Sequence, residues 1–474
     1  GLVGSEMCIR DSNMSMTKEM TTGKPYKLIL SFALPMIFGN VFQQLYNMVD
    51  TIIVGKYVGV DALAAVGSTG AINFLVIGFA LGICSGFSIP VAQSFGAGNH
   101  SQMRKYVANS IYLSVIASII LTVSTMLLTG PILRITNTPE EIYDDAYRYI
   151  IVIFAGISAT IFYNMLSGIL RALGDSKTPL VFLGISSVLN IILDLTFIIV
   201  FKWGVFGASF ATVISQGISA LLCLFYTIKN YDILRFDSFE LKPDLEKMKK
   251  LVVIGVPMAL QFSITAIGSI ILQSAVNTLG KTAVASMTAA IKIQTVAVGP
   301  MESMGITMAT YCGQNRGAGK YSRITAGIGQ SIAMTMVYCV AACAAVSFLG
   351  GALTTLFIDK NTADSENIQK IIDLSVYYLR INGLFYPFLG VLFIIRNSLQ
   401  GMGYSMLPML AGVSELAARS LVAILFVSSI GYTAVCLASP VAWIFADVVL
   451  LITYTVKIKE LKNELIFRKH EAVV

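Results

Sequence analysis

The sequence predicts an all-α integral membrane protein in which twelve transmembrane helices form two parallel six-helix repeats, or lobes, around a central cavity. Three observations support this fold class. Of the 474 residues, 56% are hydrophobic and 12% are charged, whereas a soluble domain carries roughly 25% charged residues. The apolar residues gather in twelve long segments. Motifs from the first half of the chain also recur in the second half.

The twelve apolar segments lack the period-2 alternation of strands. Each is long enough for a helical crossing of about 20 residues, and a helix satisfies its own backbone groups inside lipid. The predicted spans are 27–50, 63–88, 107–130, 146–168, 180–201, 205–228, 250–275, 284–310, 325–350, 374–396, 406–428 and 432–456.

Polar segments complete the predicted domain organisation. Residues 1–13 (GLVGSEMCIRDSN) are interpreted as a non-native leader. We expect an N-terminal lobe at 14–228, a cytoplasmic connector at 229–249, a C-terminal lobe at 250–456 and a basic cytoplasmic tail at 457–474.

Lysines and arginines indicate the orientation. They gather at both chain ends, in the connector and in the loops after the second and eighth spans, and are sparse in the alternate loops. Because cytoplasmic loops carry an excess of basic residues, we predict that both termini are cytoplasmic and that the protein lies in the plasma (inner) membrane. The net charge of +7 then reflects topology and gives no support to a nucleic-acid partner.

The second half of the chain repeats the first. QSFGAG at 93–98 recurs as QNRGAG at 314–319, an offset of 221 residues, and Pro35 matches Pro257 at an offset of 222. Six spans separate the equivalent points, so the chain returns to the same side of the membrane. The repeats are therefore parallel, with a cavity expected between them near the midplane.

Two acidic residues lie inside apolar segments of the first lobe. Asp50 stands in QQLYNMVDTIIVG and Asp194 in VLNIILDLTFIIV. Ionisable residues in membrane spans are costly and usually functional. From the rise of 1.5 Å per residue, both carboxyl groups fall in the outer half of the membrane, where they can share a site. The alternative for Asp50 is a frayed helix end near the surface.

Neighbouring polar residues fit a cation site around these acids. Asn190 lies four residues before Asp194, and Gln43 lies seven before Asp50, so each amide shares a helix face with its acid. Thr212 on the next span reaches a comparable depth. Such oxygens can hold a proton between the carboxyl groups or bind Na⁺ at Asp50 and Asp194; the sequence leaves the choice open.

Pro35 lies fifteen residues before Asp50 in the same span. A proline inside a helix removes a backbone hydrogen bond and permits a kink. The kink could change with the charge of the site, or the proline could simply be tolerated in a membrane helix.

The second lobe carries a different set of charges. Glu415 and Arg419 are four residues apart, which predicts a neutralising pair on one helix face. Glu302 is the candidate for meeting a cationic substrate in the cavity. The sequence assigns no role to the remaining charged residues, which are Lys292, Arg396 and Asp447.

The sequence contains few residues or motifs that are typical of an enzyme active site. The chain has two histidines and seven scattered cysteines. GAGKYS at 317–322 fails as a phosphate loop, because Tyr321 stands where a magnesium-binding hydroxyl is needed. We expect no enzyme activity and no cofactor, other than a proton or Na⁺ as coupling ion.

Taken together, the motifs resemble the multidrug and toxic compound extrusion (MATE) family of secondary transporters. The matching segments are LPMIFGNVFQQLYNMVDTIIVGKYVGVDALAAVG at 34–67, the paired GAG loops, RALGDSKTP at 171–179 and NIILD at 190–194. The resemblance implies drug efflux driven by a proton or sodium gradient. Carried over by residue, it implies that Asp50, Asn190, Asp194 and Thr212 form the cation site with Gln43 close by, and that Pro35 is the bending proline. One departure is that 257–269 has no acidic residue, which some family members carry there.

The expected function is a cation-coupled antiporter that exports small, amphipathic, often cationic organic molecules by alternating access. We expect a monomer in the lipid bilayer, with a cavity rich in Met, Phe and Tyr. The alternative is a flippase of lipid-linked or polysaccharide precursors on a related bundle, which would need several cations in its cavity.

Overall fold

The structure is a computed structural model that describes residues 17–136, 138–357 and 365–471, and in these ranges it contains helices and no strand. The predicted leader at 1–13 lies outside the described residues. The helices are α2 (Pro25–Tyr57), α3 (Val60–Gly96), α4 (His100–Ile135), α5 (Glu140–Ala155), α6 (Ile157–Ala172), α7 (Lys177–Leu195), α8 (Gly204–Asn230), α9 (Leu245–Asn277), α10 (Lys281–Gly317), α11 (Tyr321–Thr354), α12 (Ser365–Leu384), α13 (Tyr386–Gly401), α14 (Met406–Ile430) and α15 (Tyr432–Glu471), with short turns η1 (Thr196–Val200), η2 (Asp232–Leu234) and η3 (Thr355–Phe357). The predicted all-α class is confirmed.

Length and hydropathy identify the candidate membrane spans. Within the described residues, ten helices are each long and apolar enough to cross a membrane. The pairs α5 with α6 and α12 with α13 pass the same test together, bent by 45° and 52°. With each pair counted as one span, the total is twelve, as the sequence predicts.

The two bends occupy the fourth span of each repeat. The sequence predicts unbroken helices at 146–168 and 374–396, but Gly156 and Phe385 interrupt them. Pro387 lies in the first turn of α13, where its missing N–H would have no helical partner anyway. The first bend has no proline, so the sequence around Gly156 does not distinguish a break from a glycine inside a continuous helix.

The chain folds into two compact units that do not coincide with the repeats. One holds residues 1–259 and 313–320, and the other holds 260–312 and 321–474. The first unit thus contains the start of α9 and the α10–α11 turn, which belong to the second repeat by sequence. The predicted lobes at 14–228 and 250–456 follow the repeat and stay a prediction.

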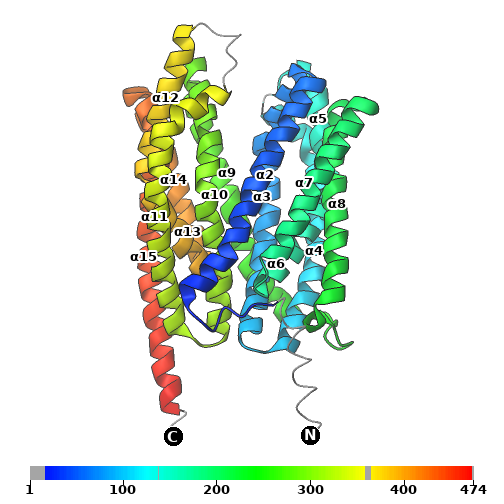
Figure 1. Cartoon of the computed structure of the whole chain (residues 1–474), viewed down its shortest axis with the longest axis vertical. Coiled ribbons are helices and arrows are strands. Elements are labelled where there is room, and N and C mark those ends of the chain that lie inside the picture. The colour runs from blue at the N-terminus through cyan, green and yellow to red at the C-terminus, as the bar shows by residue number, and fades with distance from the viewer. Residues whose placement is uncertain (1–16, 137, 358–364, 472–474) are drawn as a thin grey trace. The chain divides into compact units, whose positions relative to one another are not determined.

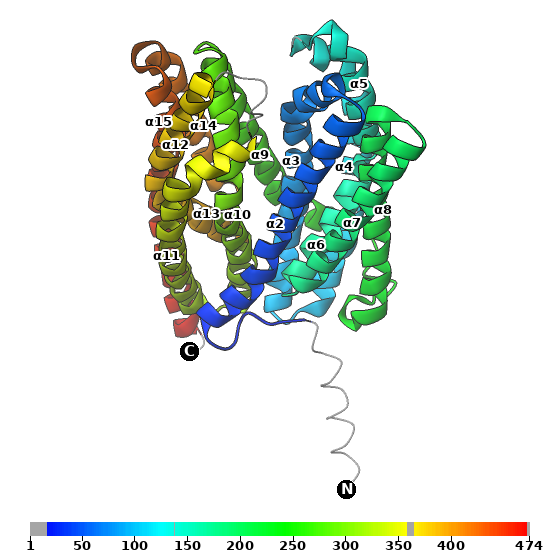
Figure 2. The same cartoon turned by 45° about the horizontal axis from the view of Figure 1, so that its top comes forward.

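In the first unit, α3 packs against α4, α5 and α6, and α2 runs along α7 (Figures 1 and 2). Two apolar clusters fill the interior, one around Phe87 and Met165 and the other around Ile150 and Phe154. Many large apolar side chains, such as Ile119, are exposed. An exposed apolar surface of this extent suits a lipid environment.

The turns that carry the repeated GAG motif meet in the first unit. A Cβ atom added at Gly96 would lie 2.0 Å from the carbonyl oxygen of Gln314, and one at Gly317 would lie 1.8 Å from that of Gln93. Only glycine permits such an approach of two backbones. The repeat exchanges these two contacts, since Gln93 matches Gln314 and Gly96 matches Gly317. The two turns are therefore related to each other by an approximate two-fold symmetry at this contact.

The connector predicted at 229–249 is held firmly against α4. Arg104 donates to both carboxylate oxygens of the buried Glu240, at 2.5 and 2.9 Å. Hydrogen bonding to this guanidinium lowers the pKa of Glu240 to about 2. The Tyr112 hydroxyl donates to the carbonyl oxygen of Leu241 at 2.6 Å.

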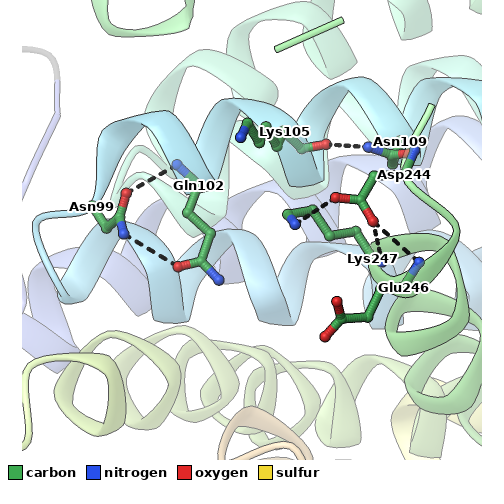
Figure 3. Close-up of polar contacts among 7 residues, drawn as sticks. All are labelled: Asn99, Gln102, Lys105, Asn109, Asp244, Glu246 and Lys247. Atoms are coloured by element: carbon green, nitrogen blue, oxygen red, sulfur yellow. Dashed lines mark hydrogen bonds and ion pairs between the residues drawn. The ribbon is translucent and has the colours of Figure 1, made fainter. Parts of the chain in front are cut away.

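The connector ends at Asp244, which caps α9 (Figure 3). The Asp244 carboxylate accepts from the backbone N–H groups of Glu246 and Lys247 at 3.1 and 3.2 Å, which satisfies free donors of the first helical turn. Lys247 also donates to it from Nζ at 2.6 Å, and the pKa of Asp244 is lowered as a result. The backbone N–H of Asp244 in turn donates to Asn109 Oδ1 on α4 at 2.9 Å.

In the second unit, α14 and α15 pack along each other, and α11 packs against α12 and α13. Cys339 is buried on α11, where its thiol donates to the carbonyl oxygen of Tyr386 at 3.3 Å. Cys339 therefore serves as a small packing residue at the α11–α13 contact.

Candidate functional site

Asp50 and Asp194, the two acids singled out in the sequence, come together in the first unit. Asp50 lies on α2 and Asp194 near the end of α7, and these helices run side by side (Figure 1). Their carboxyl groups lie within hydrogen-bonding reach of each other. Asp194 is fully buried, and Asp50 is partly buried. A proton on one carboxyl group can therefore be shared with the other, because an ionised carboxylate can only accept.

Asn190 and Thr212 lie next to this pair. Asn190 is buried on α7 one turn before Asp194, and its Nδ2 donates to Thr212 Oγ1 on α8 at 3.3 Å. The Thr212 hydroxyl donates to the carbonyl oxygen of Ala208 at 3.1 Å. The structure thus brings Asn190 and Thr212 into direct contact, on the helices that border the acids.

A π-helical turn, η1, begins two residues after Asp194. Such turns insert an extra residue into a helix and occur often at functional sites. The apolar sequence of this turn, TFIIV, gives no indication of it.

Two tyrosines also belong to the site, although sequence reasoning did not select them. Tyr46 and Tyr149 both interact electrostatically with the carboxyl groups of Asp50 and Asp194. Tyr46 lies four residues before Asp50, so helical spacing places it on the same face. Tyr149 matches Tyr378 in the repeat, and it lies near Asp50 because it belongs to the same apolar cluster as Ile53 and Val54 of α2.

Gln43 and Pro35 occupy different surroundings on α2. Gln43 is exposed, in contrast to Asn190 and Asp194, and its part in the cation site stays a prediction. Pro35 lies within one continuous helix, Pro25–Tyr57. It leaves the carbonyl oxygen of Ser31 without its N–H partner.

The charges of the second lobe form a buried cluster in the second unit. Glu415 accepts from Arg396 Nη2 and from Arg419 Nη2, each at 2.8 Å. All three side chains are buried. The predicted Glu415–Arg419 pair is therefore present, and α13 adds the second arginine. Asp447 is buried on α15 within electrostatic range of Arg396 and Glu415.

Glu302 and Lys292 both lie on α10 and differ in solvent exposure. Glu302 is half-buried two residues after Pro300, whereas Lys292 is exposed. The role of Glu302 toward a substrate stays a prediction.

Known protein families and solved structures resemble this chain in sequence and in fold. The MatE family model matches residues 35–196 and again residues 257–425, which reproduces the internal repeat. The chain belongs to the MatE family. It is 30% identical over 385 residues to the probable multidrug resistance protein YpnP of Bacillus subtilis, covering 81% of this chain and 84% of that protein. It is also 26% identical to the probable multidrug resistance protein NorM of Thermotoga maritima, with 81% and 82% covered.

Solved structures agree in fold. A MOP superfamily transporter from Pyrococcus furiosus matches with a TM-score of 0.87 and 24% identity, covering 94% of this chain and 98% of that chain. An outward-facing multidrug resistance MATE transporter matches with a TM-score of 0.85 and 23% identity over the same shares. This MATE protein is therefore a multi-pass membrane transporter of a multidrug efflux family.

Proposed function

We propose that this MATE protein exports small amphipathic, often cationic organic molecules in exchange for an inward-moving cation that binds at Asp50 and Asp194. The protein would act as a monomer in the inner membrane, with both termini in the cytoplasm. The observation that carries the proposal is that the fully buried Asp194 and the partly buried Asp50 meet between the packed helices α7 and α2 of the first unit.

This contact favours the proton as the coupling ion. One proton shared between the acids removes part of their negative charge, whereas two neighbouring ionised carboxylates repel each other. Na⁺ at the same oxygens is the alternative, with the carbonyl oxygen of Asn190 and the hydroxyl of Thr212 as further ligands of the type that hard cations prefer.

The position of the acids links their charge to helix movement. Asp50 is on α2 and Asp194 is on α7, so loss of the shared proton would push these helices apart. Pro35 supplies the weak point at which α2 could bend. Solved MATE structures have been described in a bent and in a straight conformation, which supports bending as part of alternating access in this chain.

The test is efflux of a fluorescent organic cation from proteoliposomes under separately imposed proton and sodium gradients. Asp50→Asn and Asp194→Asn keep the size of each side chain and remove its charge. We expect both variants to reach the membrane normally and to lose transport against a gradient. Unchanged efflux in both variants would show that Asp50 and Asp194 do not form the coupling site. Transport sustained by a sodium gradient alone would show that Na⁺ is the coupling ion.

The alternative function is a flippase of anionic precursors. Such a protein needs cationic side chains for its substrate, and the candidates are Arg396 and Arg419. Both arginines already donate to Glu415, which offsets part of their charge. Organic cation efflux is therefore the better supported function. Transport of an anionic lipid probe, with no transport of the fluorescent cation, would favour the flippase.

A further inference from the structure

A short segment before α2, Lys18–Thr21, packs against other parts of the first unit; we call it the strap. Its last two residues are buried, with Met20 1% exposed and Thr21 5% exposed, whereas Lys18 is exposed. Burial removes the backbone N–H and carbonyl groups of Met20 and Thr21 from water, so these groups need specific partners.

The first partner is the α10–α11 turn of the second repeat. Gln314 Oε1 accepts from the backbone N–H of Met20 at 2.8 Å, and Asn315 Nδ2 donates to its carbonyl oxygen at 3.1 Å. Lys320 Nζ donates to the carbonyl oxygen of Thr21 at 3.0 Å. Gln314 and Asn315 are fully buried. The turn therefore recognises the backbone of the strap with three side chains.

The other partners belong to the first repeat. The Lys18 N–H donates to the carbonyl oxygen of Leu173 at 3.1 Å, in the α6–α7 turn. A Cβ at Gly174, whose φ is +88°, would lie 1.9 Å from the Lys18 carbonyl oxygen, so this contact needs glycine. Lys18 Nζ also donates to Ser31 Oγ on α2 at 2.7 Å. Ser31 is the residue whose carbonyl loses its helical partner to Pro35, so the strap is bonded directly to the hinge of α2.

The repeat supplies a comparison. The connector precedes α9 as the strap precedes α2, and it docks on α4, the counterpart of α11. Each leading segment therefore binds the hairpin of the other repeat. The connector does so through the two-pronged Arg104–Glu240 ion pair, whereas the strap is held by hydrogen bonds to neutral groups, two of them donated by Lys320 and Lys18. A bidentate pair between two charged groups is stronger than single hydrogen bonds in which one partner or neither is charged, so the strap is the attachment that can release.

We propose that the strap is a latch at the cytoplasmic end of the transporter. It ties the α6–α7 turn to the α10–α11 turn while that end is closed, and it lets go when the transporter opens to the cytoplasm. Bending of α2 at Pro35 moves Ser31 and so pulls on Lys18. The inference depends on the orientation and the alternating access proposed above.

Accessibility of Met20 during turnover tests the latch. In inside-out vesicles, a membrane-impermeant maleimide should label Met20→Cys slowly at rest and several-fold faster once drug and a proton gradient are supplied. The matched control is Thr22→Cys, which is exposed and should label quickly at one rate. Adding Asp50→Asn should abolish the increase at Met20→Cys. The unmodified chain gives the background from native cysteines.

Reversible closure of the latch gives an independent measurement. Thr21→Cys with Lys320→Cys, joined by a bifunctional methanethiosulfonate reagent, should lose efflux and recover it on reduction, while each single variant keeps efflux throughout. Equal efflux before and after cross-linking, or a constant labelling rate at Met20→Cys while the protein transports, overturns the latch. Failure of the unmodified chain to export drug in these vesicles would instead overturn the proposed function.

Discussion

At the scale of single residues, the site is defined by ionisable groups inside membrane helices. Asp194 is fully buried in a membrane helix, where an ionisable group costs on the order of 2.5–3.5 kcal/mol on insertion scales. Glu415 is buried as well, but its two arginines account for its presence. Asp50 and Asp194 have mainly each other, which is why they are the candidates for coupling.

The residues around the acids should matter less than the acids themselves. We expect Asn190→Ala and Thr212→Ala to lower the rate of efflux while leaving uphill transport measurable, because each removes one neutral contact and no charge. Initial rates in proteoliposomes would measure this, with Asp194→Asn as the reference for complete loss. Complete loss in Asn190→Ala at normal expression would show that the amide is an essential ligand.

At the scale of the element, α2 joins three features of the proposed cycle. It carries Asp50 near its C-terminal end, Pro35 in its interior and, at Ser31, the hydrogen bond to Lys18. Pro35→Ala would complete the helical ladder of backbone hydrogen bonds and stiffen this point. We expect the variant to fold and insert, yet to lose most efflux. Full efflux from a normally expressed Pro35→Ala protein would show that the proline is only tolerated.

The connector shows a second element whose behaviour depends on charge. The pKa of Glu240 is lowered to about 2 by Arg104, below its ordinary value of about 4.3, so its ionised form stabilises the fold. That contribution is complete above the ordinary pKa and is lost as pH falls toward the folded value. At pH 7, Glu240→Gln should therefore be less stable by about 1.5–3 kcal/mol.

Thermal unfolding of the purified protein in detergent at a series of pH values measures this effect. The gap between the unmodified chain and Glu240→Gln should be widest at neutral pH and narrow below about pH 4. Glu246→Gln is the matched control, since Glu246 is exposed in the first turn of α9, directly after the connector. A gap that stays constant with pH would mean that packing, and not charge, holds the connector.

At the scale of the whole molecule, orientation in the membrane is the property that the charge pattern predicts most directly. Ser238 is exposed in the connector, which we place in the cytoplasm. Ser238→Cys should resist an impermeant thiol reagent in intact cells and react after lysis. Labelling in intact cells would show that the connector lies outside the cell. The predicted orientation, and with it the direction of export, would then be wrong.

The sequence by itself determined the helical membrane class, the twelve spans and the repeat, since these depend on apolar length and on motifs that recur at a fixed offset. It also selected Asp50 and Asp194, because a charge inside an apolar run is visible without a structure. Only the tertiary structure brought the two acids together, since contact between α2 and α7 depends on packing of helices far apart in sequence. The contacts of the strap could not be predicted for the same reason, because Met20 and Gln314 are 294 residues apart. The sequence of a polar segment before a span does not indicate which turn will bury it.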